Sequence, residues 1–271
     1  MLRSSNPILS KRDSFTPAAP YGRGSAPYPG QNMYGRSPYG APTQTGTERP
    51  MTFDDVVSKT AATMGVLMIA AAAAWMLVPP ALYFPALVAS GLIGFIVVLV
   101  VSFRRMVSPG LVLAYAAIEG VFIGMISKMF ESFYAGIVTQ AIIGTFAAAG
   151  VTLAAYKFFN IRVTPKFTKI VFLATVAFAV AALINFVLYM VGFPSPLRAG
   201  ITGPVGLMAI AFSLLGAVLA VLNLVLDFDY IEQGVRMGAP AREAWRGAFG
   251  LTVTMVWLYI ELLRLLSYLR R

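Results

Sequence analysis

Residues 200–234 read GITGPVGLMAIAFSLLGAVLAVLNLVLDFDYIEQG. The stretch is apolar over more than 20 residues and then becomes acidic at Asp227 and Asp229. About 20 apolar residues are enough to cross the roughly 30 Å hydrocarbon core of a bilayer as a helix. Acidic groups in such a segment are costly, so they usually face protein or water and mark a pathway or a switch. The stretch therefore predicts a membrane helix whose end carries functional carboxylates.

The rest of the chain repeats this apolar pattern. Of its 271 residues, 58% are hydrophobic and 12% are charged, and the mean hydropathy is +0.76. A soluble domain cannot bury that much apolar surface. We therefore predict an all-α membrane protein, a bundle of seven transmembrane helices. The apolar runs lie near 60–78, 82–101, 109–129, 133–156, 168–193, 200–228 and 247–269.

Local signals refine the ends and contacts of these helices. Thr52-Phe53-Asp54-Asp55 predicts a helix start, since acids in the first turn suit the helix dipole. Pro79-Pro80 ends the first apolar run and leaves a short turn before the second. Gly120 and Gly124 form a Gly-x-x-x-Gly pair in the third run, which predicts close helix packing.

The first 50 residues differ from the remainder. They are rich in Pro, Gly, Ser, Tyr and Arg, which predicts a disordered tail before a seven-helix domain over 51–271. The tail lacks the apolar core of a signal peptide. A solvated leader is the favoured interpretation of the tail, and a segment that binds a protein partner is the alternative.

Basic residues predict the orientation in the membrane. Lys and Arg gather at the end of the bundle where the chain enters, which predicts a cytoplasmic N-terminus in a multi-pass protein of the plasma (inner) membrane. Seven spans then place the C-terminus outside, although Arg270 and Arg271 weigh against this. The charge of +10 suits loops at an anionic membrane surface, and we expect no nucleic-acid partner.

Several classes of chemistry are excluded or disfavoured. The chain has no Cys, so it has no disulfides or thiolate metal sites, and it has no His, the usual neutral-pH switch. It contains no His-Glu-x-x-His, no Gly-x-Ser-x-Gly and no phosphate-cradling loop. We expect a protein that is not an enzyme and needs no cofactor, and any proton sensing must come from carboxylates.

Four carboxylates are the candidate proton-sensing or ion-pathway residues: Glu119, Asp227, Asp229 and Glu261. Glu119 and Glu261 lie well inside apolar runs, where function is slightly favoured over structure. In a regular helix Asp227 and Asp229 point to nearly opposite sides, so they cannot face the same partner. Structural alternatives remain, because Glu261 and Glu232 are spaced to pair with Arg264 and Arg236 along their own helices.

Parts of the chain resemble the Bax inhibitor-1 (transmembrane BAX inhibitor motif) family, in its bacterial subgroup. The resemblance is carried by Phe228-Asp229, by Leu258-Tyr259-Ile260-Glu261-Leu262 and by Ile118-Glu119-Gly120-Val121-Phe122-Ile123-Gly124. Gly238-Ala239-Pro240, Trp245 and Ala248-Phe249-Gly250 point to the bacterial subgroup. The similarity extends over about 52–271 and leaves the tail out. Glu261 stands where relatives usually carry Asp.

This resemblance implies a pH-sensitive leak that is permeable to Ca²⁺. In the family, two facing carboxylates on the last two helices are thought to form a latch that shares a proton, since two close acids cannot both ionise cheaply. The latch would here be Asp229 and Glu261, which also become candidate Ca²⁺ contacts. Lipid, Ca²⁺ and H⁺ are the expected partners. The alternative is a membrane protein that modulates a protease or stress-response complex without carrying ions.

The spacing of the acids along the chain complicates this pairing. If the sixth helix ends near Gly234 and the seventh begins near Gly247, Asp229 lies about 8 Å and Glu261 about 21 Å from those ends. A longer sixth helix or a tilted seventh would bring them level. Otherwise Glu261 meets Glu119 in mid-membrane, and Asp229 pairs with a loop arginine. The sequence leaves these alternatives open.

Overall fold

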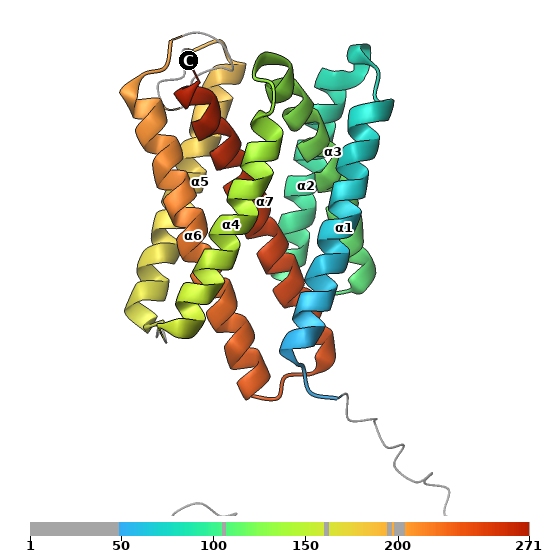
Figure 1. Cartoon of the computed structure of the whole chain (residues 1–271), viewed down its shortest axis with the longest axis vertical. Coiled ribbons are helices and arrows are strands. Elements are labelled where there is room, and N and C mark those ends of the chain that lie inside the picture. The colour runs from blue at the N-terminus through green and yellow to red at the C-terminus, as the bar shows by residue number, and fades with distance from the viewer. Residues whose placement is uncertain (1–48, 105–106, 160–162, 194–196, 198–203, 271) are drawn as a thin grey trace, which may run out of the picture. The chain divides into compact units, whose positions relative to one another are not determined.

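A computed structural model of the chain describes residues 49–104, 107–159, 163–193, 197 and 204–270. The predicted tail lies outside these residues, apart from Arg49 and Pro50. The described residues form seven long helices and no named strand, which confirms the all-α prediction (Figure 1). The helices are α1 (Phe53–Leu77), α2 (Tyr83–Phe103), α3 (Pro109–Phe133), α4 (Ile137–Phe158), α5 (Pro165–Met190), α6 (Leu207–Arg236) and α7 (Ala244–Leu269), with 3₁₀ turns η1 (Pro80–Leu82) and η2 (Ala241–Glu243).

The predicted start of α1 is confirmed. Thr52 is its N-cap, and its hydroxyl accepts the Asp55 backbone N–H at 3.2 Å. The Asp55 carboxylate in turn accepts the Thr52 backbone N–H at 3.0 Å, which completes a capping box. The helix ends at Leu77, directly before the turn that contains Pro79 and Pro80.

The sixth helix differs from its predicted range of 200–228. It begins at Leu207, after Pro204 and Gly206, and continues past both aspartates to Arg236. The predicted range followed the apolar run, which shows where the chain leaves the hydrocarbon core of the membrane. The helix itself continues until a residue interrupts its backbone hydrogen bonds. Here the break comes at Gly238, whose φ of 65° is left-handed, and at Pro240.

The bundle is organised around α7. Figure 1 shows α7 crossing the middle of the view, and it packs against α1, α3, α4 and α6. Helix α2 packs on α3, and α5 packs on α6, so these two helices lie at the periphery. More than half of the most apolar window of α7 is buried, against less than a fifth for α2 and α5. Residues on α7 therefore meet protein on most sides.

The predicted Gly pair joins α3 to α1. A Cβ atom built on Gly120 would collide with the carbonyl oxygen of Leu67, and one on Gly124 would collide with that of Ala71. The two helix backbones come this close only because both positions lack a side chain.

A short segment before α1 clasps the turn between α6 and α7. The backbone N–H of Met51 donates to the Ala239 carbonyl at 2.7 Å, and that of Ala241 donates to the Arg49 carbonyl at 3.0 Å. Lys59 adds a bond from its Nζ to the Ala241 carbonyl at 2.6 Å. We call residues 49–51 the strap. Arg49 and Pro50, assigned to the tail by composition, thus contact the helical bundle.

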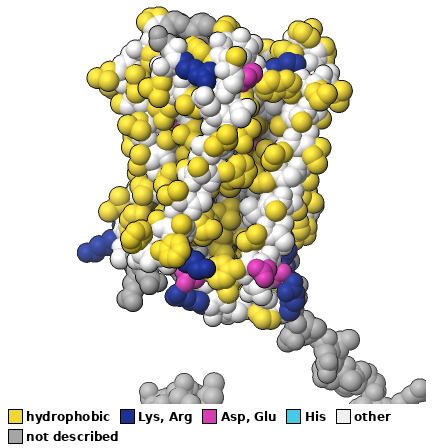
Figure 2. Space-filling view, viewed as in Figure 1, with side chains coloured by type: hydrophobic (Ala, Val, Ile, Leu, Met, Phe, Trp, Pro, Cys, Tyr) yellow, Lys and Arg dark blue, Asp and Glu magenta, His cyan; other side chains and the backbone are white. Residues whose placement is uncertain are grey.

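The surface fits a lipid environment. All seven helices are long and apolar enough to span a membrane. Figure 2 shows hydrophobic side chains over the middle of the visible face, with the charged side chains gathered toward its two ends. The chain is a multi-pass membrane protein. We call the end where α1 and α7 begin and α6 ends the strap end.

Candidate functional site

Asp227 lies on the side of α6 that faces α7. Its Oδ2 accepts a hydrogen bond from the Thr254 hydroxyl at 2.6 Å. A Cβ atom built on Gly250 would lie 3.4 Å from Asp227 Oδ1, so the glycine makes room for the carboxylate. The acid therefore sits between two helices, held by a neutral donor.

A pocket of about 410 Å³ gives access to this carboxylate. Its wall is formed by α2, α6 and α7, and it contains Tyr230 and Arg246 as well as Asp227 and Thr254. Arg246 lies in the first turn of α7, so the pocket reaches the strap end of the bundle. The Arg246 Nε donates to Glu243 at 2.9 Å, and this ion pair offsets the positive charge at the mouth. The apolar lining comprises Val98, Val101, Val107, Phe249 and Val253.

Glu119 lies at a similar depth but does not line this pocket. Its carboxylate faces α2, where a Cβ atom built on Gly94 would lie 2.6 Å from Glu119 Oε2. One turn closer to the strap end on α3, Tyr115 contacts Phe249 of α7, and their ring centroids are 5.0 Å apart. Glu119 is therefore level with the turn of α7 that follows Phe249, which is the turn that meets Asp227. The side chain is 9% exposed.

Asp229 faces α4 instead. Its Oδ1 accepts from the Tyr156 hydroxyl at 3.2 Å, and its Oδ2 accepts from the Gln233 amide at 2.5 Å. The same tyrosine hydroxyl lies 2.5 Å from Glu232, which also pairs with Arg236 as its spacing predicted. Asp229 thus belongs to a polar cluster between α4 and α6. Among the described residues its hydrogen-bond partners are Tyr156 and Gln233, in place of the loop arginine that the sequence left open. The prediction that the two aspartates face opposite sides of α6 is confirmed.

Glu261 lies deep in the bundle against α6. It is 1% exposed, and a Cβ atom built on Gly216 would lie 2.9 Å from its Cδ. The stretch of α6 from Gly216 to Asp229 is about 20 Å long at about 1.5 Å per residue. The structure therefore keeps Asp229 and Glu261 apart, even though α6 is longer than predicted.

Glu261 is also distant from Glu119. Ser127 of α3 and Tyr259 of α7 share a hydrogen bond of 2.6 Å, which sets the two helices in register. Counting from that bond, Glu119 lies about 12 Å toward the strap end and Glu261 about 3 Å the other way. The two glutamates are separated by about 15 Å along the bundle, and they face different helices.

The four predicted acids thus occupy separate positions. Asp227, Asp229 and Glu119 lie at similar depths but face α7, α4 and α2, and Glu261 lies farther from the strap end. No group of three acidic side chains that could hold a metal ion occurs within the described ranges. The pocket instead offers the Asp227 carboxylate and the hydroxyls of Thr254 and Ser102, which are hard oxygen ligands. Such a sparse set suits brief contact with a passing cation, since conduction requires that binding be weak enough for release.

Sequence reasoning missed the neutral partners of these acids. Thr254 and Tyr156 lie far from Asp227 and Asp229 in the chain, and neither stands out within its apolar run. No local pattern marks them, because their contacts are made between helices. Only the small residue at Gly250 hints that something approaches α7 there.

Comparison with known proteins gives a family match. A family model described as "Bax inhibitor 1 like" matches residues 6–271, which is nearly the whole chain. The match includes most of the N-terminal tail, which the resemblance inferred from the sequence had left out. A search of curated proteins finds no match.

Proposed function

Because the chain belongs to the Bax inhibitor 1 like family, we propose that it is a pH-sensitive leak for Ca²⁺ and related cations. The proposed location is the plasma membrane, with the N-terminus in the cytoplasm. In this proposal the protein is a passive pathway rather than an enzyme, and Ca²⁺ is its cargo rather than a cofactor.

The observation that supports this best is the position of Asp227. Its carboxylate lines a pocket of about 410 Å³ that begins at the strap end, and it accepts a hydrogen bond from the neutral hydroxyl of Thr254. An ionised carboxylate in such a place attracts cations into the bundle. Glu119, at a similar depth but facing α2, adds a second negative group at that level of the bundle.

Protonation supplies the switch. When Asp227 takes up a proton it loses its charge, and its attraction for a cation falls. The change also alters the contact between α6 and α7, because the neutral carboxyl can itself donate a hydrogen bond. A single site can therefore couple pH both to the affinity for the cation and to the packing of the two helices. This proposal moves the switch from Asp229 and Glu261 to Asp227.

The test is Ca²⁺ flux into dye-loaded proteoliposomes over a series of pH values. We expect wild type to pass Ca²⁺ with a pH-dependent rate. Asp227→Asn carries an amide of the same shape as the protonated acid, so its flux should match that of wild type at low pH at every pH tested. Glu119→Gln should reduce flux while leaving a pH dependence.

Asp229→Asn is the matched control. It makes the same chemical change on the same helix, but at a side chain that faces α4. It should retain the wild-type profile, as should Glu261→Gln, because neither side chain lines the pocket. Silence of wild type at every pH, or an unchanged profile in Asp227→Asn, would refute the proposal.

A modulator of a protein complex is the second candidate. It is favoured by the reach of the family match into the tail, from residue 6 onward. Deletion of residues 1–48 removes the tail and keeps the strap. A modulator should lose its partner in a pull-down on this deletion and should show no flux in pure liposomes, whereas a leak should keep its flux.

A further inference from the structure

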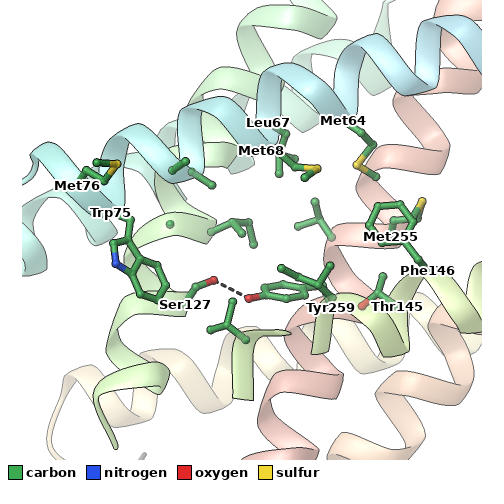
Figure 3. Close-up of a pocket in the computed structure, with 17 residues that line it drawn as sticks. Met64, Leu67, Met68, Trp75, Met76, Ser127, Thr145, Phe146, Met255 and Tyr259 are labelled. Atoms are coloured by element: carbon green, nitrogen blue, oxygen red, sulfur yellow. Dashed lines mark hydrogen bonds between the residues drawn. The ribbon is translucent and has the colours of Figure 1, made fainter. Parts of the chain in front are cut away.

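A second pocket, of about 400 Å³, lies in the half of the bundle away from the strap end. It is bounded by α1, α3, α4 and α7, and it is distinct from the pocket that contains Asp227. Figure 3 shows Met64, Met68 and Met76 of α1 on one side of it, with Tyr259 and Ser127 opposite. None of the four acids discussed above lines it. The proposed function gives this pocket no role.

The lining offers few polar groups to an occupant: the Trp75 indole N–H and three hydroxyl groups. Each of these hydroxyls takes part in a hydrogen bond within the protein. Ser127 and Tyr259 bond to each other at 2.6 Å, and Thr145 donates to the Ala141 carbonyl at 2.7 Å. The remaining lining is almost entirely hydrocarbon and thioether. A molecule that fits here is therefore apolar along its length.

The pocket opens sideways toward lipid. Two of its α1 residues, Met68 and Met76, are 53% and 80% exposed, and Phe146 of α4 is also exposed. Its floor is the central helix, where Met255 and Tyr259 are each 7% exposed. Figure 1 shows α7 between α4 and α1 in this view. An occupant can thus enter from the bilayer between α1 and α4 and reach α7.

Size and length narrow the choice of occupant. The lining of α1 runs from Met64 to Met76, about 18 Å at about 1.5 Å per residue. One leaflet of a roughly 30 Å hydrocarbon core is about 15 Å thick. A helix from another protein, about 10–12 Å across, would fill more than about 1,400 Å³ over that length, whereas the whole empty space in and above the pocket is about 1120 Å³. The pocket is too small for a helix but matches a single flexible chain.

The methionines support the same choice. Met64, Met68, Met76 and Met255 place four flexible thioether side chains around the space. Methionine adapts its shape to irregular apolar partners, which suits a mobile hydrocarbon chain better than a rigid ring system. We propose that this pocket binds one acyl chain of a phospholipid from the adjacent leaflet, inserted between α1 and α4 against α7.

The test uses a photoreactive lipid. The full-length protein is reconstituted in phosphatidylcholine vesicles that contain a phosphatidylcholine with a diazirine on one acyl chain. After illumination, labelled residues are identified by mass spectrometry. The proposal expects label on Met255 and Tyr259, which lipid at the outer surface cannot reach. Ile170 of α5, which is 67% exposed, should be labelled in every sample as a measure of ordinary lipid contact.

Two substitutions on α1 decide the result. Ala72→Phe places a ring in the pocket from an exposed position, and it should abolish labelling of Met255 and Tyr259. Ala61→Phe makes the same change three turns toward the strap end, outside the pocket, and should leave the labelling unchanged. Thermal unfolding of both variants checks that they are folded. Label on Ile170 without label on Met255 and Tyr259, or equal labelling in folded Ala72→Phe, would overturn the proposal.

Discussion

At the scale of single residues, the function of an acid here depends on which way it points. Asp227 and Asp229 stand two positions apart, and each residue of an α-helix turns by about 100°. That rotation directs Asp227 to Thr254 on α7 and Asp229 to Tyr156 on α4. Asp227 therefore lines a pocket, whereas Asp229 belongs to the polar cluster between α4 and α6.

The Thr254 hydroxyl is expected to be the stabilising partner of Asp227. Thr254→Val keeps the shape of the side chain but leaves the carboxylate without this donor. We expect it to lower the free energy of unfolding by about 1–3 kcal/mol, the usual cost of a buried polar group left unsatisfied. Thr254→Ser should restore most of the loss. Chemical unfolding in detergent provides the measurement.

Thr252→Val is the control for this change. Thr252 is buried two residues earlier on α7, and its hydroxyl donates to Ala248 within the same helix. That carbonyl already belongs to the helical ladder, so the loss should be much smaller. If both Val variants unfold alike, Thr254 contributes nothing specific to Asp227.

At the scale of helices, close packing of α1 on α3 depends on two missing side chains. Gly124→Ala would put a Cβ against the backbone of Ala71, where no flexible group can move aside. We expect a loss of about 1–3 kcal/mol, as for other overpacked positions. Gly150→Ala on α4 is the matched control, since no atom lies within 4 Å of its built Cβ. Its better helix propensity should leave stability unchanged or slightly raised. Equal effects of the two changes would contradict this account of the α1–α3 contact.

The contact between α1 and the α6–α7 turn leads to a second prediction at the scale of helices. Lys59 donates to the Ala241 carbonyl and lies 5.7 Å from the ring centroid of Trp245. Lys59→Met keeps the apolar stem but removes both interactions, so we expect a loss of about 1–2 kcal/mol. Lys166→Met, at an exposed position on α5, should have no measurable effect. Thermal unfolding compares the two, and a stable Lys59→Met protein would mean that the strap alone holds the turn.

At the scale of the whole molecule, the seven described helices alternate in direction, so α1 begins and α7 ends at opposite ends of the bundle (Figure 1). The distribution of Lys and Arg predicts that the strap end is cytoplasmic. The chain contains no cysteine, so one introduced cysteine is a unique reporter. Ser108→Cys lies at the strap end and Ser132→Cys at the other, and both positions are exposed.

A maleimide that cannot cross membranes reads out this orientation. Ser108→Cys should react only in inside-out vesicles, and Ser132→Cys only in right-side-out vesicles. Reaction of both in the same preparation would contradict a membrane crossing by α3, and the reverse pattern would place the strap end outside.

The number of spans, the start of α1 and the tight Gly pair on α3 could all be predicted from the sequence. Each rests on a rule that runs along the chain: apolar length against bilayer thickness, a cap before a helix, or small residues one turn apart. The opposed directions of Asp227 and Asp229 follow likewise from helical rotation. The family resemblance was also accessible from short stretches in the third, sixth and seventh helices, and the family match confirms it.

Only the tertiary structure decided which groups meet. Thr254 opposite Asp227, Gly216 beside Glu261 and Glu119 level with Asp227 all follow from how far each helix slides and turns against its neighbours. Those offsets are set by contacts distant in the chain, such as Ser127 with Tyr259 and Gly124 with Ala71. The sequence alone determined that acids lie inside a seven-helix membrane bundle. The packing determined that Asp227 and Glu119 share a depth, whereas Asp229 and Glu261 do not. The reason is that the register between two helices depends on which side chains are in contact, and periodicity along the chain does not determine this.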